Sequence, residues 1–260
     1  LWRAPTENDG LKLFMDKRGL PDYLFYYEHK AMYEWLDAGL DELRFSPPRF
    51  ERPTDGAPRL RVLHEVETRT GRPAGRFVQS LRFGGDEVLV ECIFDLDPGL
   101  PELPRVGLGT ALAPLFEKAR WYGRGPHECY PDRKAGAALG VWESSVDGLQ
   151  VPYVLPQENG NRCDVRWVEL ASDETALRID GWPAFNFVAS HHETEQLWKA
   201  THTHELARRP ETYLRLDAAQ RGLGTASCGP DTLERYRVYP AAYRLSLRLA
   251  PRPARGRAAP

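Results

Sequence analysis

The composition of this chain is that of an ordinary globular protein with little net charge. It has 260 residues, of which 42% are hydrophobic and 28% are charged, and this provides ample material for a core. Lys and Arg (35) nearly balance Asp and Glu (37), so the formal net charge is −2 and no basic field is available to hold nucleic acid. We find no signal peptide and no apolar run long enough to span a bilayer, so we expect no membrane partner.

The predicted elements are nearly all short extended segments. Gly and Pro each occur 22 times and fall at short intervals, which favours strands and turns over helices. Apolar and polar residues alternate over 88–97, and with 77–83 before it and a Gly-Gly-Asp turn between, the pattern predicts a β-hairpin. In chain order, the predicted strands are 60–68, 77–83, 88–97, 177–180, 185–189, 213–216, 235–239 and 243–249.

Only one helix is predicted, over residues 193–201, where Ser190 and Glu193 fit a capping box. The proline-rich segment 46–58 is expected to be an exposed connection, and 251–260 is expected to be a flexible tail. Many strands with so little helix indicate an all-β antiparallel sandwich, formed by one domain over residues 1–250. A TIM barrel is excluded because its eight strand-and-helix alternations are missing.

The cysteines of the chain show no metal or redox pattern. None of them lies in a Cys-x-x-Cys pair, so neither a zinc site nor a dithiol redox centre is indicated. Scattered thiols without a disulfide framework favour a reducing compartment, and we expect a cytoplasmic protein. The four positions are Cys92, Cys129, Cys163 and Cys228.

Two pairs of acidic residues share strand faces, Glu65 with Glu67 and Asp95 with Asp97. A glycosidase needs two carboxylates flanking the bond that it cleaves. Acids at alternate positions of a strand are more often only a solvated face. We therefore assign no catalytic residue to this chain.

The histidines do not form a metal motif. His202 and His204 would share a face if extended, and His191 and His192 precede the predicted helix. A zinc site needs three or four convergent ligands, and the sequence offers no third partner at a telling distance. We interpret these residues as surface or hydrogen-bonded core histidines.

The Gly-rich run over 222–227 resembles the start of a dinucleotide loop, but it has Ser227 where the third glycine belongs. Ser227 and Cys228 are nucleophile types without a nearby base, so a loop is the better interpretation. The aromatic residues (7 Trp, 11 Tyr and 10 Phe) suit either a sugar-binding surface or a β-sandwich core. The residues alone therefore do not name a reaction.

Three stretches carry a resemblance that covers nearly the whole chain. They are LWRAPTENDG (1–10), WYGRGPHECYPDR (121–133) and PYVLPQENGNRC (152–163), and Gln196-Leu197, Thr201-His202 and His204 continue the match. In order and spacing they resemble the C-terminal, small-chain region of β-galactosidases of glycoside hydrolase family 2. The first residue is Leu1 rather than Met, and we expect the chain to be part of a longer polypeptide.

The resemblance implies a large antiparallel supersandwich of the galactose-mutarotase type. It also implies a retaining β-galactosidase acting on terminal β-galactosides such as lactose, in which a TIM barrel supplies the catalytic glutamates. The partners implied are the remaining domains or large chain, a galactoside substrate and, for the parent enzyme, a homo-oligomer. No cofactor is required in this chain, and Mg²⁺ is expected only in the catalytic domain.

Two further sites come from the resemblance alone. The loop 222–230 matches one that presents a Trp to the sugar; here Cys228 stands at that position, so Ser227, Cys228 and Gly229 are expected to line the pocket by backbone and shape. Main-chain oxygens of Leu155, Pro156 and Leu197 match those that hold a cation in the family, which implies a structural monovalent cation.

The charged residues of the three stretches are expected to tie loops together rather than to contact sugar. These residues are Arg3, Asp9, Glu128, Asp132, Arg133, Glu158 and Arg162. Two other functions stay open, a stand-alone carbohydrate-binding module and an aldose 1-epimerase. The second fits less well, because an epimerase needs a Glu base facing a His acid, whereas the adjacent His127 and Glu128 would point to opposite faces of a strand.

Overall fold

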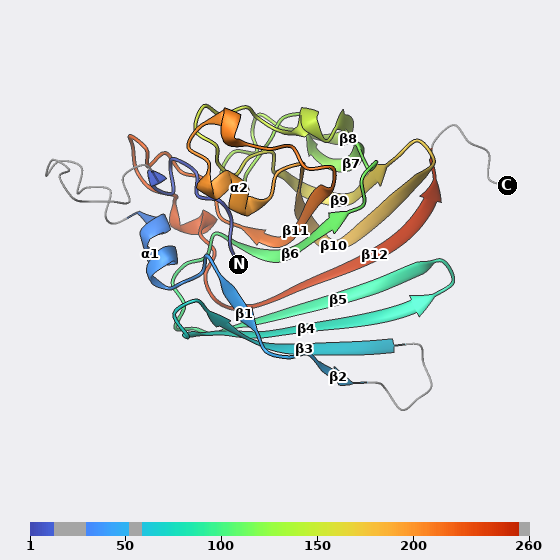
Figure 1. Cartoon of the computed structure of the whole chain (residues 1–260), viewed down its shortest axis with the longest axis horizontal. Coiled ribbons are helices and arrows are strands. Elements are labelled where there is room, and N and C mark those ends of the chain that lie inside the picture. The colour runs from blue at the N-terminus through green and yellow to red at the C-terminus, as the bar shows by residue number, and fades with distance from the viewer. Residues whose placement is uncertain (13–29, 52–58, 255–260) are drawn as a thin grey trace, which may run out of the picture.

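The computed structural model describes residues 1–12, 30–51 and 59–254, and its regular structure is mainly one antiparallel β-sheet. Helices α1 (Ala31–Asp37) and α2 (Thr194–Lys199) lie at one end of the sheet (Figure 1). The strands are β1 (Leu43–Phe45), β2 (Arg49–Glu51), β3 (Arg59–Thr68), β4 (Pro73–Gly84), β5 (Glu87–Leu96), β6 (Arg105–Leu112), β7 (Lys118–Gly125), β8 (Ala138–Ser145), β9 (Arg162–Ala171), β10 (Thr175–Ser190), β11 (Thr212–Gln220) and β12 (Ala242–Pro253).

The sheet folds over on itself at strand β10. The main strand order is β1-β3-β4-β5-β12-β10-β9-β7-β8, with β11 and then β6 branching from β10 and β2 pairing with β3. Residues 175–182 of β10 pair with β12, whereas residues 186–190 pair with β11. In Figure 1, β3, β4, β5 and β12 form a lower layer beneath β6 to β9 and β11. The predicted all-β antiparallel supersandwich is confirmed.

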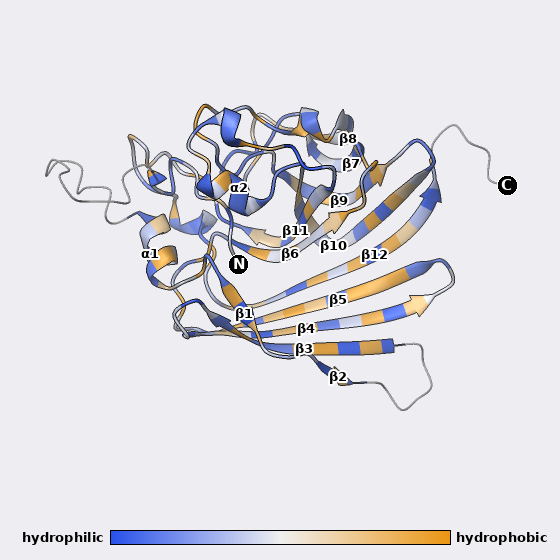
Figure 2. Cartoon of the chain, in the orientation of Figure 1, coloured by the Kyte–Doolittle hydropathy of each residue, from blue (hydrophilic) through white to orange (hydrophobic). Residues whose placement is uncertain are grey.

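Apolar side chains of both layers meet in one core. Phe94 of β5, Leu214 of β11 and Leu247 of β12 are buried and belong to the same hydrophobic cluster, as does Trp35 of α1. Hydrophobic and hydrophilic residues alternate along the lower strands in Figure 2, as expected for strands with one face toward the core. The burial of this apolar surface is the main force that holds the two layers together.

The clearest strand predictions are confirmed. Segments 60–68, 213–216 and 243–249 lie within β3, β11 and β12, and the predicted hairpin is formed by β4 and β5. Segments 177–180 and 185–189 are parts of the single strand β10, whose pairing with β9 shifts register between Asp180 and Phe185. That irregularity explains why the sequence pattern breaks in two.

The predicted strand 235–239 is wrong. Glu234–Tyr236 form a short 3-10 helix instead. Arg237, which follows, donates from Nε to the Thr232 carbonyl at 2.9 Å and pairs with Asp231. These local polar contacts outweigh the weak alternation of the segment, so it does not join the sheet.

The predicted helix exists, but it is shorter and begins differently. It spans Thr194–Lys199, and the Glu193 N–H donates to Gln196 Oε1 at 3.1 Å. Ser190 is the last residue of β10, and its hydroxyl accepts from the His192 N–H. The predicted Ser190–Glu193 capping box is therefore wrong, and the pair that closes the helix start is Glu193–Gln196.

The predicted connection 46–58 and the predicted tail 251–260 each contain strand residues. Strand β12 continues through Pro253, which pairs with Thr175, and so reaches three residues into the predicted tail. Exposed strand β2 lies inside the predicted connection 46–58. The rest of that connection (52–58) and residues 255–260 lie outside the described residues.

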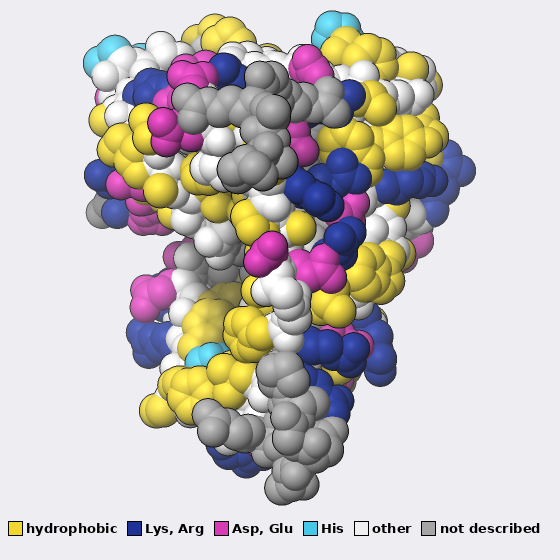
Figure 3. Space-filling model, turned by 90° about the vertical axis from the view of Figure 1, so that its right-hand side faces the viewer, with side chains coloured by type: hydrophobic (Ala, Val, Ile, Leu, Met, Phe, Trp, Pro, Cys, Tyr) yellow, Lys and Arg dark blue, Asp and Glu magenta, His cyan; other side chains and the backbone are white. Residues whose placement is uncertain are grey.

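Among the residues that the structure describes, no helix is long and apolar enough to cross a membrane. On the end of the molecule shown in Figure 3, positive and negative side chains are interspersed among hydrophobic patches. This mixture agrees with the near-zero net charge of the sequence. A continuous basic surface for a polyanion is not visible on that face.

Candidate functional site

The loop 222–230 is held from the first motif by one asparagine. Asn8 Oδ1 accepts hydrogen bonds from the Ser227 N–H at 3.0 Å and from the Ser227 hydroxyl at 2.7 Å. Asn8 Nδ2 donates to the Gly224 carbonyl at 3.1 Å. Since these contacts join residues more than 200 positions apart, the start of the chain fixes the loop near its end.

The second motif holds the other side of the same loop. The Asp132 carboxylate accepts from the N–H groups of Leu223 at 3.1 Å and Gly224 at 2.7 Å. Arg133 Nη2 donates to the Gly224 carbonyl at 2.6 Å. Gly224 has a φ of +64°, and a Cβ there would lie 2.6 Å from the Thr232 nitrogen, so the turn requires glycine.

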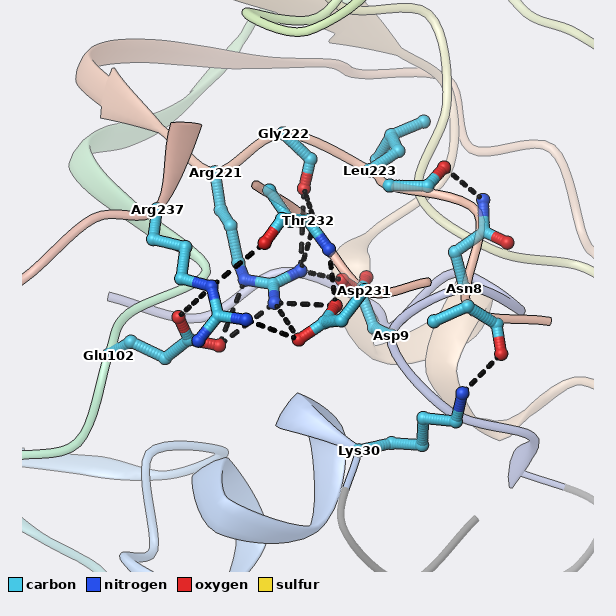
Figure 4. A network of polar contacts seen from close by, with 12 residues as sticks. Asn8, Asp9, Lys30, Glu102, Arg221, Gly222, Leu223, Asp231, Thr232 and Arg237 are labelled. Atoms are coloured by element: carbon cyan, nitrogen blue, oxygen red, sulfur yellow. Dashed lines mark hydrogen bonds and ion pairs between the residues drawn. The ribbon is translucent and has the colours of Figure 1, made fainter. Parts of the chain in front are cut away.

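A buried ion cluster lies beneath the loop (Figure 4). Arg221 is fully buried, and its Nη2 lies 2.9 Å from both Glu102 and Asp231. Arg221 Nη1 lies 3.4 Å from Asp9, and Arg237 pairs with Asp231 at 3.2 Å. The side chain of Arg221 thus joins three acids from distant parts of the chain.

Burial and ion pairing act in opposite directions on the acids of this cluster. Burial raises the pKa of Glu102, and the neighbouring Arg221 only partly opposes it. Burial also tends to raise the pKa of Asp231, but Arg221 outweighs it and holds that pKa below its ordinary value. Asp231 is therefore a carboxylate at neutral pH, as its role in anchoring the loop base requires.

A second buried cluster is centred on Arg105. It pairs with Glu158 of the third motif at 3.0 Å and with Asp217 at 2.6 Å. Burial raises the pKa of Asp217, with Arg105 opposing. In both clusters one arginine pairs with two acids at once, so neither pair of acids is free to act as the acid and nucleophile of a glycosidase.

The charged motif residues serve structure, as expected. Arg3 and Asp9 form a fully buried pair at 2.7 Å. Glu128 accepts from the Gly160 N–H at 2.7 Å and from the Tyr153 hydroxyl. Arg162 Nη1 donates to the Gly160 carbonyl at 2.8 Å. These contacts agree with the expectation that the charged motif residues tie loops together.

The three predicted pocket residues lie together on this anchored loop. Cys228 is exposed, and its N–H and that of Gly229 both donate to the Thr225 carbonyl. Ser227 is engaged with Asn8. The loop is therefore a tight, fixed turn that presents the Cys228 thiol, and its contact with sugar stays a prediction.

The predicted cation ligands are in contact with a side chain of the protein. Lys12 Nζ donates to the carbonyl oxygens of Pro156 at 2.6 Å and Leu197 at 2.8 Å. The Leu155 carbonyl instead accepts from Gln157. Burial lowers the pKa of Lys12 to about 8, with Glu205 opposing, so the ammonium form still dominates at neutral pH. A free cation does not fit here, because a positive charge already occupies the position.

One histidine, His191, lies beside two acidic residues that are distant from it in the sequence. His191, Glu117 and Asp147 have ligand atoms within 4.8 Å of one another. Arg208, however, pairs with Glu117 at 2.7 Å and with Asp147 at 3.3 Å. The guanidinium neutralises the acids that a metal would need, so we interpret this group as an ion-pair network. His202 and His204 are exposed and lie side by side, with ring centroids 5.4 Å apart.

Asn8, Lys12 and Arg221 are among the residues that sequence analysis did not single out. Asn8 lies within the first quoted motif, so its position was visible but its role was not. Lys12 and Arg221 carried no signal, because their partners are distant in sequence.

The family model described as β-galactosidase small chain matches residues 1–249. This chain belongs to the β-galactosidase small-chain family. The small-chain domain is 33% identical over 268 residues to a β-galactosidase of Arthrobacter sp. (strain B7), covering 96% of this chain and 25% of that protein. It is 42% identical over 142 residues to a Vibrio cholerae β-galactosidase, covering 55% and 13% respectively.

The small-chain domain therefore spans about a quarter of the length of its Arthrobacter relative. Among solved structures, a candidate aldose 1-epimerase from Escherichia coli K12 aligns with 80% of this chain and 69% of that one, with 11% identity and a TM-score of 0.44.

Proposed function

We propose that this small-chain domain is the C-terminal accessory part of a retaining β-galactosidase of glycoside hydrolase family 2. In this proposal a TIM-barrel domain elsewhere in the enzyme supplies the two catalytic glutamates and any Mg²⁺. The loop 222–230 completes the sugar pocket at the boundary between the two domains. The natural substrate is a terminal β-galactoside such as lactose, and the enzyme works as a homo-oligomer in the cytoplasm.

The observation that carries this proposal is the double anchoring of the loop. Asn8 of the first motif and Asp132 of the second bind its backbone from two sides. Five hydrogen bonds from Asn8, Asp132 and Arg133 to the loop backbone fix its shape, and the Ser227 hydroxyl adds a sixth. A turn held in this way suits a pocket wall that must keep its position while a neighbouring domain performs the chemistry.

The division of labour is supported by the state of the acids. The carboxylates of both clusters are ion-paired through Arg221 or Arg105, whereas hydrolysis with retention needs a nucleophile and an acid about 5 Å apart and free to react. The cytoplasmic assignment is supported by the scattered spacing of the four cysteines in the sequence, which shows no disulfide framework.

Assaying the isolated chain on a chromogenic β-galactoside tests where catalysis resides. We expect no turnover above the uncatalysed rate. Turnover well above that rate would show that the domain carries its own catalytic pair and would overturn the proposal. Sugar titration by NMR of the same sample tests the carbohydrate-module alternative, which predicts saturable galactoside binding.

The role of the loop is tested in the full-length enzyme with Asn8→Ala and Asn8→Asp. Asn8→Ala removes the contacts of Asn8 with Ser227 and Gly224 and leaves only the Asp132 side of the anchoring. We therefore expect kcat/KM to fall by about 10–100-fold with little change in melting temperature. Asn8→Asp keeps the acceptor for Ser227 and is expected to retain most of the activity. Equal activity of both variants and the wild type would contradict a loop that shapes the pocket.

The epimerase alternative is not favoured by any contact in the site. Its base would have to be a free glutamate facing a histidine. Glu128, the acid next to His127, instead accepts from the Gly160 N–H and the Tyr153 hydroxyl. Polarimetry with a freshly dissolved aldose should therefore show no acceleration of mutarotation.

A further inference from the structure

Four main-chain oxygens converge on the side-chain nitrogen of Lys12. Lys12 Nζ lies 2.6 Å from the Pro156 carbonyl oxygen, 2.8 Å from that of Leu197 and 3.2 Å from that of Trp198, and the Ala200 carbonyl also accepts from it. An ammonium group has only three protons to donate. Four oxygens around one nitrogen therefore form a coordination cage for a spherical charge rather than a simple set of hydrogen bonds.

The oxygens are available because of where helix α2 ends. Leu197 and Trp198 lie in its last turn, and the N–H of the C-cap residue Ala200 donates to Gln196. The last carbonyls of a helix have no partner of their own and carry the negative end of its dipole. The fourth oxygen comes from Pro156 in the third motif. A positive charge is thus required where the motif loop meets the helix.

The ligand set suits a monovalent ion. The oxygens in contact with Lys12 Nζ are neutral carbonyls, whereas protein sites for Ca²⁺ and Mg²⁺ normally include carboxylates. Rings of carbonyl oxygens replace the hydration shell of K⁺ or Na⁺ in other proteins. Two of these oxygens, those of Pro156 and Leu197, are also the ones for which family resemblance implies a cation.

We propose that Lys12 is a covalently attached substitute for a monovalent metal ion, and that its side chain makes this cage independent of Na⁺ and K⁺. The ammonium group binds the end of helix α2 and the loop of the third motif together. Because Lys12 lies just after the first motif (1–10), its side chain also ties that motif to both. Removing the side chain leaves an open carbonyl cage, which then binds an alkali metal ion.

The experiment measures melting temperature of the full chain in NaCl, KCl and choline chloride at equal ionic strength. Wild type is expected to melt at the same temperature in all three salts. Lys12→Ala is expected to melt lower in choline chloride and to regain about 2–4 °C in a saturable manner with Na⁺ or K⁺. Lys199→Ala, which removes an exposed lysine from the same helix, should behave as the wild type.

Each other outcome overturns the proposal. If the wild type shows the same saturable response to one alkali ion, Lys12 does not replace that ion. If Lys12→Ala is destabilised equally in all three salts, Lys12 is only a cap on the helix end. If Lys12→Ala does not fold in choline chloride, its refolding yield is measured in NaCl and KCl, and a yield that neither salt restores also excludes the cage.

Discussion

Arg221 shows how one buried side chain supports an exposed loop. It contacts Glu102, Asp231 and Asp9, and its backbone carbonyl accepts from Arg3 at 3.0 Å. Loop 222–230 starts at the next residue. The position of the loop therefore depends on a charge that never reaches the surface.

Replacing Arg221 with methionine should be strongly destabilising. The substitution removes the charge that Asp9, Glu102 and Asp231 share and leaves each of them only its second arginine, Arg3 or Arg237. We expect a loss of about 3–5 kcal/mol in the free energy of unfolding, measured by urea denaturation. Arg248→Met is the control, because it removes an ion pair with Glu87 in which both side chains are over one-third exposed. This control should cost at most about 1 kcal/mol. Equal losses would mean that burial of the Arg221 cluster carries no special weight.

The lowered pKa of Asp231 predicts how this cluster responds to acid. Arg221 opposes burial and keeps the folded-state pKa below the unfolded value of about 3.9. The stability contributed by the carboxylate is therefore present above about pH 4 and is lost as the pH falls through the folded-state pKa. The gap in unfolding free energy between wild type and Asp231→Asn should be constant from about pH 5 to 7 and should narrow toward pH 3. A gap that widens in acid would contradict this sign.

For single residues, the sequence predicted which charged side chains are structural better than it predicted the residues that they contact. The quoted motifs contain Asn8, Asp132 and Glu158. The expectation that the charged motif residues tie loops together agrees with the contacts of Asp132 and Glu158, but it did not include Asn8. The partner of each lies about 50 to 220 residues away, however. Without the fold, neither the Arg221 cluster nor the capture of carbonyl oxygens by Lys12 could be predicted.

Strands were predictable where apolar residues on the buried face alternate in the sequence with polar residues on the exposed face. Strands β5 and β12 alternate apolar and polar residues and were found. Strand β7 (KARWYGRG) also alternates in burial, but two of its buried positions are Gly123 and Gly125. Glycine has no hydropathy signal, so the period is hidden. Helix α1 has only seven residues, too few for a helical period to stand out.

Gly123 is required on β7 because another strand lies against it. A Cβ at this position would be 2.8 Å from Val165 Cγ2 and 2.9 Å from Val165 Cα. We expect Gly123→Ala to cost about 1–3 kcal/mol by overpacking, as measured by thermal or urea unfolding. Gly136→Ala is the matched control, since a Cβ there meets no atom within 4 Å. A neutral Gly123→Ala would show that β7 and β9 can separate without cost.

The strands that the structure describes form a single sheet, and they differ in whether one or both of their edges are paired. Strands β5, β12 and β10 are paired on both sides, whereas among the strands that the structure describes β1 and β2 pair only with β3, and β8 pairs only with β7. The all-β class follows from composition and turn spacing, but the fold-over at β10 does not. It depends on one strand exchanging partners along its length, which a local pattern cannot encode.

Hydrogen exchange should follow this order of coverage. Backbone N–H groups in β5, β12 and the centre of β10 should exchange slowest, near the rate set by global unfolding, and those of β1, β2 and β8 fastest. Mass spectrometry of peptides from each strand provides the measurement. Edge strands that are protected as strongly as β12 would indicate that another surface covers them in solution.

The pairing of β5 with β12 and of β6 with β11 has a consequence for how the chain can be divided. Strands β1 to β6 all end before residue 113, and β7 to β12 all begin after residue 117. A break in the short connection between them would separate the chain into two polypeptides, each with unsatisfied hydrogen-bonding edges that only the other completes. Residues 88–95 against 242–249, and 105–112 against 212–220, would then act as two complementary recognition surfaces. The two polypeptides should reassemble on mixing. The alternation of apolar and polar residues at both contacts should set the strand register.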